Sequence, residues 1–232
     1  MTVTDFALSS PASSYLITVA IDDYVMTEDT SASGVPLTYW TPRGDKRSLE
    51  ALRATPRALR WLEEKLGPYP FDSLGSVVVP AEAAMETQTM ITYGNTSHAL
   101  SESTVVHEVA HHWYGNIVSP SDWRDVWMNE GMTTYLELLW QSEQGDSDLD
   151  TLLDDAARFD QIGRTNAGPA GAYDPRAFGQ SNIYYGPALM WHEVRERIGD
   201  DEFWEMTRAW PTVHAGGNSN REVYLDWVEE QT

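Results

Sequence analysis

The apolar residues follow two different periods along the chain. In the first part they alternate with polar residues or form short runs, as in Tyr15–Ile21 and Val77–Val79, which is typical of β-strands. The strands predicted in this way cover residues 15–21, 37–41, 77–79 and 90–93. Between the second and third of them, leucines recur at helical spacing over residues 48–66, where Pro56 must either kink the helix or mark a second start after Thr55. We therefore expect strands and helix to be mixed up to residue 95.

After residue 95 the apolar positions recur every three to four residues, the spacing of amphipathic helices. The helices predicted from this spacing cover residues 103–114, 130–144, 148–162, 187–198, 202–210 and 221–230. Residues 163–182 are rich in Gly, Pro, Ala and Asn and predict a long loop, a feature that in compact domains tends to be functional or mobile. The pattern favours an α+β fold with a small β-sheet half followed by a mainly helical half.

The net charge of the chain limits the kinds of molecule that it can bind. With 36 Asp and Glu against 15 Lys and Arg, the chain has a formal charge of −21 and a pI near 4.4. Such a field repels phosphate backbones, and no cluster of basic residues interrupts it, so we expect neither nucleic acid nor an anionic membrane surface as a partner. Cationic ligands, including the free amino terminus of a peptide, would be attracted. For most of the acidic residues, a solvated surface is the simpler interpretation.

The chain has no cysteine, which excludes disulfides, iron–sulfur clusters, thiolate zinc sites and a cysteine nucleophile. Residues 1–10 lack the basic stretch and apolar run of a signal peptide, and no apolar segment approaches the ~18 residues that span a bilayer. We therefore expect a soluble chain without membrane insertion. The compartment stays unknown, with a slight preference for a secreted parent protein.

The string His107-Glu108-Val109-Ala110-His111 carries the strongest chemical signal, because it falls within a predicted helix. Four residues bring the helix to about 40° past a full turn, so both imidazoles can reach one metal ion. Glu108 lies about 100° around the helix, where its carboxylate can meet a metal-bound water without being a ligand. Zinc needs a third ligand, and Glu130, nineteen residues after His111, opens the next predicted helix. The alternative is an amphipathic helix whose histidines are ordinary core or surface residues.

The same residues resemble the gluzincin zinc aminopeptidases of the aminopeptidase N family. The family pattern is matched by the His-Glu-x-x-His string, eighteen intervening residues and a Glu within Asn129-Glu130-Gly131. The run His111–Asn116, followed by Trp123 and Trp127, is similar as well. The resemblance covers nearly the whole chain and implies a thermolysin-like metallopeptidase catalytic domain.

The resemblance also implies roles for these residues. One Zn²⁺ would be held by His107, His111 and Glu130, and the metal would lower the pKa of its water. Glu108 would take the proton of that water as it attacks the scissile carbonyl, and would then pass it to the leaving amine.

The family's exopeptidase signature, Gly-Ala-Met-Glu-Asn, is represented here by Ala83-Ala84-Met85-Glu86-Thr87. In the family this strand lies against the substrate backbone and its Glu binds the free α-amine. The resemblance therefore implies substrate binding by Ala83, Ala84, Met85 and Glu86, with Glu86 holding the α-ammonium. The residues at 83 and 87 depart from the signature, but the charge is kept. Without the family, Glu86 reads as an ordinary loop carboxylate.

A tyrosine before a later helix stabilises the tetrahedral intermediate in the family. Aligning Ala188-Leu189 with the family's Gly-Ala-Leu pattern places Tyr184 on that tyrosine, with Tyr185 as its neighbour. The glycine has moved, from Tyr-x-Lys/Arg-Gly to the order Tyr184-Tyr185-Gly186-Pro187, so the choice between the two tyrosines stays open in favour of Tyr184.

Family members are much longer, with an amino-terminal β-domain and usually a carboxy-terminal helical domain. Residues 11–24 are similar to the segment that closes the first of these. We therefore assign residues 1–24 to the end of that domain or a linking strand, and residues 25–232 to the zinc peptidase catalytic domain. The chain is then either an excised domain, with other domains in a longer parent, or a natural minimal form, and we expect low activity from the domain alone.

The expected function is removal of the first residue from peptides with a free amino terminus. A thermolysin-type zinc endopeptidase, which would lack an amine anchor, and a non-catalytic zinc-stabilised binding domain remain alternatives. Among the other histidines, His112 is expected to pack beside the metal pair without ligating. No metal-like spacing involves the remaining three, which are expected on the surface or in the core: His98, His192 and His214.

Overall fold

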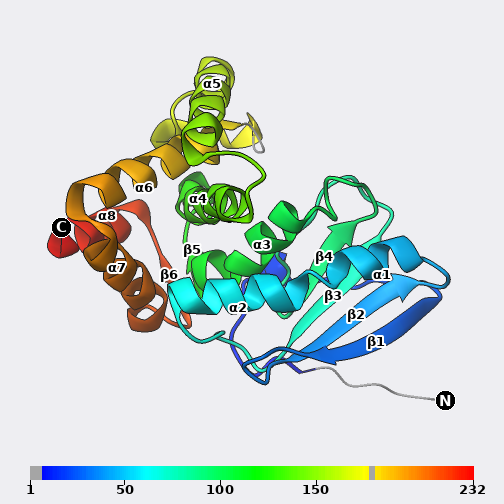
Figure 1. Cartoon of the computed structure of the whole chain (residues 1–232). Coiled ribbons are helices and arrows are strands. Elements are labelled where there is room, and N and C mark those ends of the chain that lie inside the picture. The colour runs from blue at the N-terminus through cyan, green and yellow to red at the C-terminus, as the bar shows by residue number, and fades with distance from the viewer. Residues whose placement is uncertain (1–6, 178–180) are drawn as a thin grey trace.

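The computed structural model describes residues 7–177 and 181–232 of the chain (Figure 1). Its larger sheet contains four strands in the order β1-β2-β3-β4. These strands are β1 (Tyr24–Thr30), β2 (Pro36–Pro42), β3 (Leu74–Val79) and β4 (Met90–Gly94). β1 is antiparallel to β2, whereas β2, β3 and β4 run parallel, so the sheet is small and mixed as expected. The central strand β3 is almost completely buried, which agrees with its unbroken Val77–Val79 run.

Two helices, α1 (Lys46–Leu52) and α2 (Thr55–Leu66), connect β2 to β3. Asp45 begins α1 by accepting a hydrogen bond from the Ser48 amide at 3.0 Å. The helical stretch predicted from the leucines is therefore broken, and Pro56 lies in the first turn of α2, where its missing N–H costs nothing. Leu59, Leu62 and the other apolar residues of α2 face the core.

Helices α3 (Glu102–Ala110) and α4 (Trp127–Gln144) form the centre of the molecule. α3 packs against both α2 and α4, and so lies between the sheet half and the helical half (Figure 1). From Trp127 to Trp140, α4 is buried except at Glu137, which is half-buried. A helix surrounded in this way holds its side chains in fixed positions, which suits it to carry a site.

Four helices complete the second half: α5 (Leu149–Ala167), α6 (Tyr185–Ile198), α7 (Asp200–Val213) and α8 (Arg221–Gln231). α6 packs against α4, α5 and α7. A two-stranded parallel sheet, β5 (Val118–Pro120) with β6 (Gly217–Ser219), ties the end of the chain to the segment between α3 and α4. Within the described residues, no helix is both long and apolar enough to cross a bilayer.

The predicted strand over residues 15–21 is wrong. The segment forms one 3-10 turn, Ser14–Leu16, and the first strand of the sheet begins only at Tyr24. Ile17, Val19 and Ile21 are 60%, 84% and 93% exposed, so the alternating face meets no core within this chain. Alternation predicts a strand only where one face is covered, and here nothing described covers it.

Two helix ends also differ from the sequence-based expectation. The helix predicted over 103–114 ends at Ala110 and is followed by a wide turn over His112–Asn116. α5 continues to Ala167, into the segment expected to be a loop, and short 3-10 turns follow it at Ala170–Ala172, Pro175–Ala177 and Ser181–Ile183. Residues 178–180 of the predicted loop lie outside the described residues.

Candidate metal centre and substrate cleft

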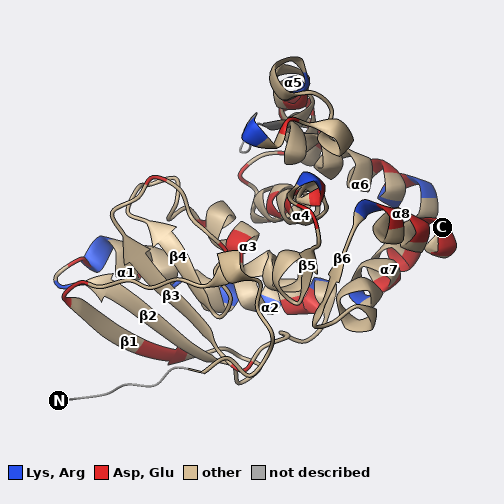
Figure 2. Cartoon of the chain, turned by 180° about the vertical axis from the view of Figure 1, so that it is seen from behind, with Lys and Arg blue, Asp and Glu red and all other residues tan. Residues whose placement is uncertain are grey.

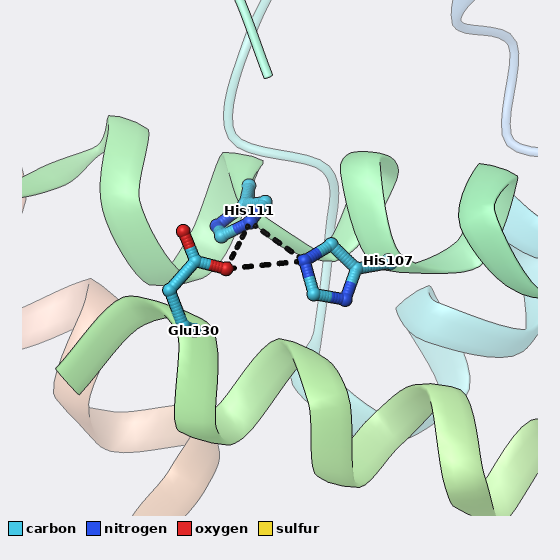
Figure 3. A group of neighbouring side chains, drawn as sticks. All are labelled: His107, His111 and Glu130. Carbon is cyan, nitrogen blue, oxygen red and sulfur yellow. Dashed lines mark hydrogen bonds and ion pairs between the residues drawn. The ribbon is translucent and has the colours of Figure 1, made fainter. Parts of the chain in front are cut away.

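Three side chains from α3 and α4 converge at the centre of the molecule (Figure 3). His107 lies in the last turn of α3, His111 caps the carboxyl end of that helix one turn later, and Glu130 lies in the first turn of α4. Nε2 of His107 is 3.1 Å from Nε2 of His111, and Oε2 of Glu130 is 3.2 Å and 3.4 Å from these two nitrogens. Tetrahedral zinc ligands at about 2.0–2.1 Å from the metal would lie about 3.3–3.4 Å apart. The three donor atoms therefore have the spacing of a zinc site.

The polar contacts at the far side of each imidazole, a hydrogen bond for His111 and an ion-pair contact for His107, support this interpretation. Nδ1 of His111 donates to the Tyr114 carbonyl at 3.0 Å, and Nδ1 of His107 lies 3.2 Å from a carboxylate oxygen of Glu137. Protons on the two Nδ1 atoms leave the Nε2 lone pairs facing each other and the Glu130 carboxylate. Three electron-pair donors this close repel one another unless a proton or a metal ion lies between them, and their number, type and spacing fit a divalent metal.

The three groups shift one another's pKa values. Burial opposes the protonation of His111, but the carboxylates of Glu130 and Glu86 outweigh it and raise the pKa of His111 to about 9. Burial likewise raises the pKa of the Glu130 carboxyl, yet His111 and His107 overcome it and lower that pKa to about 2. Glu130 is therefore ionised, and the centre attracts positive charge.

Glu137 is a functional candidate that the sequence analysis missed. It follows Glu130 by seven residues, which is two turns of α4, and so lies on the same face and reaches the back of His107. A carboxylate behind a metal-binding imidazole fixes its orientation and tautomer. The spacing of seven residues from Glu130, the third candidate ligand, was the signal that could have revealed it.

The wide turn over His112–Asn116 accounts for the residues that follow His111 in the sequence. Gly115 has φ +139°, and a Cβ there would lie 3.2 Å from Nδ1 of His111, so this position needs glycine. The turn brings the Tyr114 carbonyl within hydrogen-bond distance of His111. It also lets the side-chain amide of Asn116 donate to the Glu86 backbone carbonyl at 2.8 Å. The histidine motif and the 83–87 segment are thereby joined.

His112 points away from the centre, as expected. Its Nε2 accepts from the Thr89 amide at 3.2 Å, and its Nδ1 donates to the Val109 carbonyl at 3.3 Å. Burial lowers the pKa of His112 to about 3, so the ring stays neutral and acts in packing.

Glu108 is buried beside the two histidines, and its Oε2 atom has no hydrogen-bond partner in the described structure. Burial raises the pKa of Glu108 to about 8 against the opposing effect of His107 and His111. A carboxylate that is free of structural hydrogen bonds and has a raised pKa has the properties of a general base.

The 83–87 segment forms an extra antiparallel pairing beside β4. Met85 exchanges backbone hydrogen bonds of 2.8 Å and 2.9 Å with Thr92, and the Ala83 carbonyl accepts from the Gly94 amide at 2.9 Å. The side chain of Glu86 is buried, with His111 and Glu130 among the charges that act on it, and burial raises its pKa. An unusual substitution in the signature, Thr87, is held by a hydroxyl contact of 2.9 Å with Thr92.

The structure distinguishes the two tyrosines. The Tyr184 ring lies 6.2 Å from the His107 ring, and the pKa of its hydroxyl is raised first by Glu130, then by burial and by Glu108 and Glu86. Tyr185 instead stacks on Phe159 at 5.5 Å, and the pKa of its hydroxyl is raised by burial and then by Glu137. Tyr184 therefore lies among the groups of the candidate metal centre, and Tyr185 lies to one side.

Two close approaches hold the start of α6 in place. A Cβ on Gly131 would lie 2.3 Å from Cβ of Pro187, and a Cβ on Gly186 would lie 2.4 Å from Oδ1 of Asp160. The displaced glycine of the sequence pattern therefore lets α6 approach α5, while the glycine after Glu130 lets it approach α4. These contacts fix the backbone at Tyr184.

All the sequence-predicted site residues line one cleft of about 590 Å³. The cleft also takes in His98, which was expected to be an ordinary surface or core residue, and Glu137. Its lining consists of Ala83, Ala84, Met85, Glu86, His98, Thr104, His107, Glu108, His111, Trp123, Glu130, Thr134, Glu137, Tyr184 and Tyr185.

Comparison with known proteins agrees with this geometry. Residues 50–232 match the model of the peptidase family M1 domain. The chain is 33% identical over 143 residues to endoplasmic reticulum aminopeptidase 2 of Bos taurus, covering 55% of this chain and 15% of that protein. In an alignment of 255 positions, gaps included, it is 26% identical to probable aminopeptidase 1 of Saccharolobus solfataricus, covering 93% of this chain and 32% of that protein.

Solved structures share the fold as well. The M1 zinc metallopeptidase of Deinococcus radiodurans superposes with a TM-score of 0.75 at 26% identity, covering 90% of this chain and 48% of that one. A mutant of that enzyme bound to the substrate Tyr-Ser-Ala gives a TM-score of 0.74 at 25% identity, with the same coverage. The chain thus spans about half or less of the length of the proteins it matches. Since the family model covers most of the chain and the α+β catalytic fold agrees, the chain belongs to peptidase family M1.

Proposed function

We propose that this chain is the catalytic domain of a zinc-dependent aminopeptidase, which removes the first residue from peptides with a free amino terminus. The observation that supports this best is the convergence of two sites on one cleft. One is the metal donor set of His107, His111 and Glu130, and the other is the buried carboxylate of Glu86 on the neighbouring wall. An endopeptidase needs the first of these sites but not the second.

The chain's own groups divide the work of hydrolysis. Zinc, when bound, would supply a Lewis acid that activates water and polarises the scissile carbonyl. Glu108 would take the proton from the attacking water on its free Oε2 and deliver it to the leaving amine. The Tyr184 hydroxyl would donate to the carbonyl oxygen as negative charge builds there. Glu137 would keep the His107 imidazole oriented.

Glu86 would set where the chain is cut. Its carboxylate would pair with the α-ammonium of the peptide, and the paired 83–87 segment would lie along the substrate backbone. Because the ammonium would be held beside the metal donors, only the first peptide bond would reach the reacting groups. The same argument makes peptides with a blocked amine poor substrates.

The matched pair of a free peptide and its N-acetylated form tests this proposal. Zinc-loaded protein should cleave the free form and act poorly on the acetylated form. In Glu86→Ala, loss of a charge-assisted hydrogen bond worth about 1.5–3 kcal/mol should lower kcat/KM for the free form by about ten- to a hundredfold. The acetylated form should respond little to the variant. Equal cleavage of both forms by the wild type would favour an endopeptidase instead.

A second experiment separates the two tyrosines. Tyr184→Phe keeps the ring and its packing but removes an oxyanion donor, so kcat should fall by about 10²–10³-fold with a much smaller change in KM. Tyr185→Phe, whose ring stacks on Phe159, is the matched control and should retain most of its activity. A fully active Tyr184→Phe beside an inactive Tyr185→Phe would reverse the assignment, and two active variants would remove the oxyanion role from this segment.

We extend the proposal to the organisation of the parent chain. Residues 1–24 would be the end of an amino-terminal β-domain or a segment linking to it, and residues 25–232 the catalytic domain. The exposed apolar residues Ile17, Val19 and Ile21 support this, because a neighbouring domain would cover them. The coverage of 48% of the Deinococcus chain is also consistent with further domains in the parent.

A further inference from the structure

We propose that the cleft accepts peptides whose first side chain is uncharged or cationic and rejects those that begin with Asp or Glu. This inference rests on the proposed function, because it assigns the substrate class of the same cleft. It follows from three features of the described residues: the charges that line the cleft, the position of every basic residue, and the wall beside Glu86.

Carboxyl groups dominate the charge of the cleft. Four of its lining residues are acidic, namely Glu86, Glu108, Glu130 and Glu137. None of the lining residues in the described part of the chain is Lys or Arg. Two of the three lining histidines belong to the metal donor set, and the third, His98, is exposed at the edge. A carboxylate on the first side chain would therefore enter without a cation to receive it.

Within the part of the chain that the structure describes, none of the basic residues lines the cleft, and most are paired with carboxylates. All 15 Lys and Arg residues fall within the described residues, so no cation is contributed by residues 1–6 or 178–180. Eleven of them have a carboxylate oxygen within 4.0 Å. Arg164 comes near the cleft, behind Gly186, but its charge is paired with Asp160. Figure 2 shows the basic residues as scattered short stretches and not as a continuous patch.

The wall beside Glu86 is apolar and aromatic. With the α-ammonium at Glu86 and the scissile carbonyl at the metal donors, the first side chain lies against the lining residues next to Glu86. Met85 adjoins Glu86 in the chain, and Trp123, whose ring packs edge-on against Tyr15 at 5.1 Å, lines the same cleft. The segment around Tyr15 is joined to the residues that follow the 83–87 segment, because the Gln88 backbone amide donates to the Leu16 carbonyl at 2.9 Å.

The polarity and charge of this wall determine which first side chains of a peptide bind well. Apolar side chains bury surface against Met85 and Trp123, and the cationic head of Lys or Arg gains from the acidic field and from the face of an aromatic ring. An acidic side chain loses its water and meets like charge, with no partner to compensate. We expect kcat/KM for Glu to be at least about tenfold lower than for Gln, and the same for Asp against Asn.

The test uses fluorogenic amides of Gln, Glu, Asn, Asp, Leu and Arg with the zinc-loaded full chain. Gln and Glu have the same shape, so their ratio isolates the charge. We expect hydrolysis of Gln, Leu and Arg amides and at least tenfold slower hydrolysis of Glu amides, with a difference that shrinks as salt is raised. Equal rates for Gln and Glu would overturn this inference and leave the proposed function intact. Failure to cleave any free-amine substrate would instead overturn the proposed function.

A pair of variants tests the electrostatic cause. Ala83 is exposed at the edge of the cleft, so it can take a long side chain. Ala83→Arg should raise the ratio of Glu to Gln hydrolysis at least about threefold, whereas Ala83→Gln, the neutral control of similar length, should leave that ratio unchanged. An unchanged ratio in Ala83→Arg would show that charge is not what excludes acidic side chains.

Discussion

Glu108→Gln should lower the rate of hydrolysis by about 10²–10⁴-fold while keeping the metal and the fold. The substitution is nearly isosteric and removes only the ability of this side chain to take up a proton. Because Glu108 is buried, lies outside the metal donor set and makes no hydrogen bond through Oε2, the substitution breaks no hydrogen bond of that atom and removes no metal donor. Steady-state kinetics on a free peptide amide measure the loss.

Metal analysis and thermal unfolding of the same variant serve as controls. The zinc content should equal that of the wild type, and the midpoint of unfolding should be unchanged or slightly higher, since a neutral amide is easier to bury than a carboxylate. Hydrolysis at the wild-type rate by Glu108→Gln would show that the proton is taken by another group. Loss of zinc together with activity would mean that Glu108 helps to hold the metal.

His111→Ala should abolish both zinc binding and measurable hydrolysis. Its Nε2 is one of the three donor atoms, and two remaining donors cannot hold zinc in a structured site. The variant should also lose the stabilisation that bound zinc gives to the folded state, so its unfolding midpoint should no longer rise when zinc is added. Zinc per chain, measured on purified protein, is the primary readout.

His98→Ala is the matched control for zinc binding, because His98 lines the same cleft but is exposed and is not one of the grouped donors. It should bind about one zinc per chain, as we expect of the wild type. Stoichiometric zinc in a double variant, His107→Ala with His111→Ala, would show that the metal is bound by other residues.

The parts of the fold and site that could be predicted from the sequence are those that depend on local spacing. Helical periodicity located α4, α6, α7 and α8 to within a few residues, because each buries a stripe of its own surface. The spacing of His107 and His111 placed their imidazoles on one face for the same reason. The small mixed sheet agrees with the fold implied by the family resemblance.

The parts that could not be predicted depend on contacts between distant segments. Residues 15–21 alternate as a strand does, yet no described strand pairs with them. The end of α3 at Ala110 follows from the packing of Gly115 against Asn129 and His111, which no local pattern contains. The reason for a glycine at position 186 is its close approach to Asp160 of α5, a contact between distant segments. The spacing of Glu137 from Glu130 could be seen in the sequence. Its contact with His107, however, depends on how α4 packs against α3.

The central claim is that zinc binds where α3 and α4 meet, and anomalous diffraction at the zinc edge tests it most directly. Crystals of the zinc-loaded protein should show a single strong anomalous peak per chain. We expect it to lie within about 2.0–2.2 Å of Nε2 of His107, Nε2 of His111 and a carboxylate oxygen of Glu130. An anomalous peak at another set of residues, or no peak between these three side chains, would contradict the account.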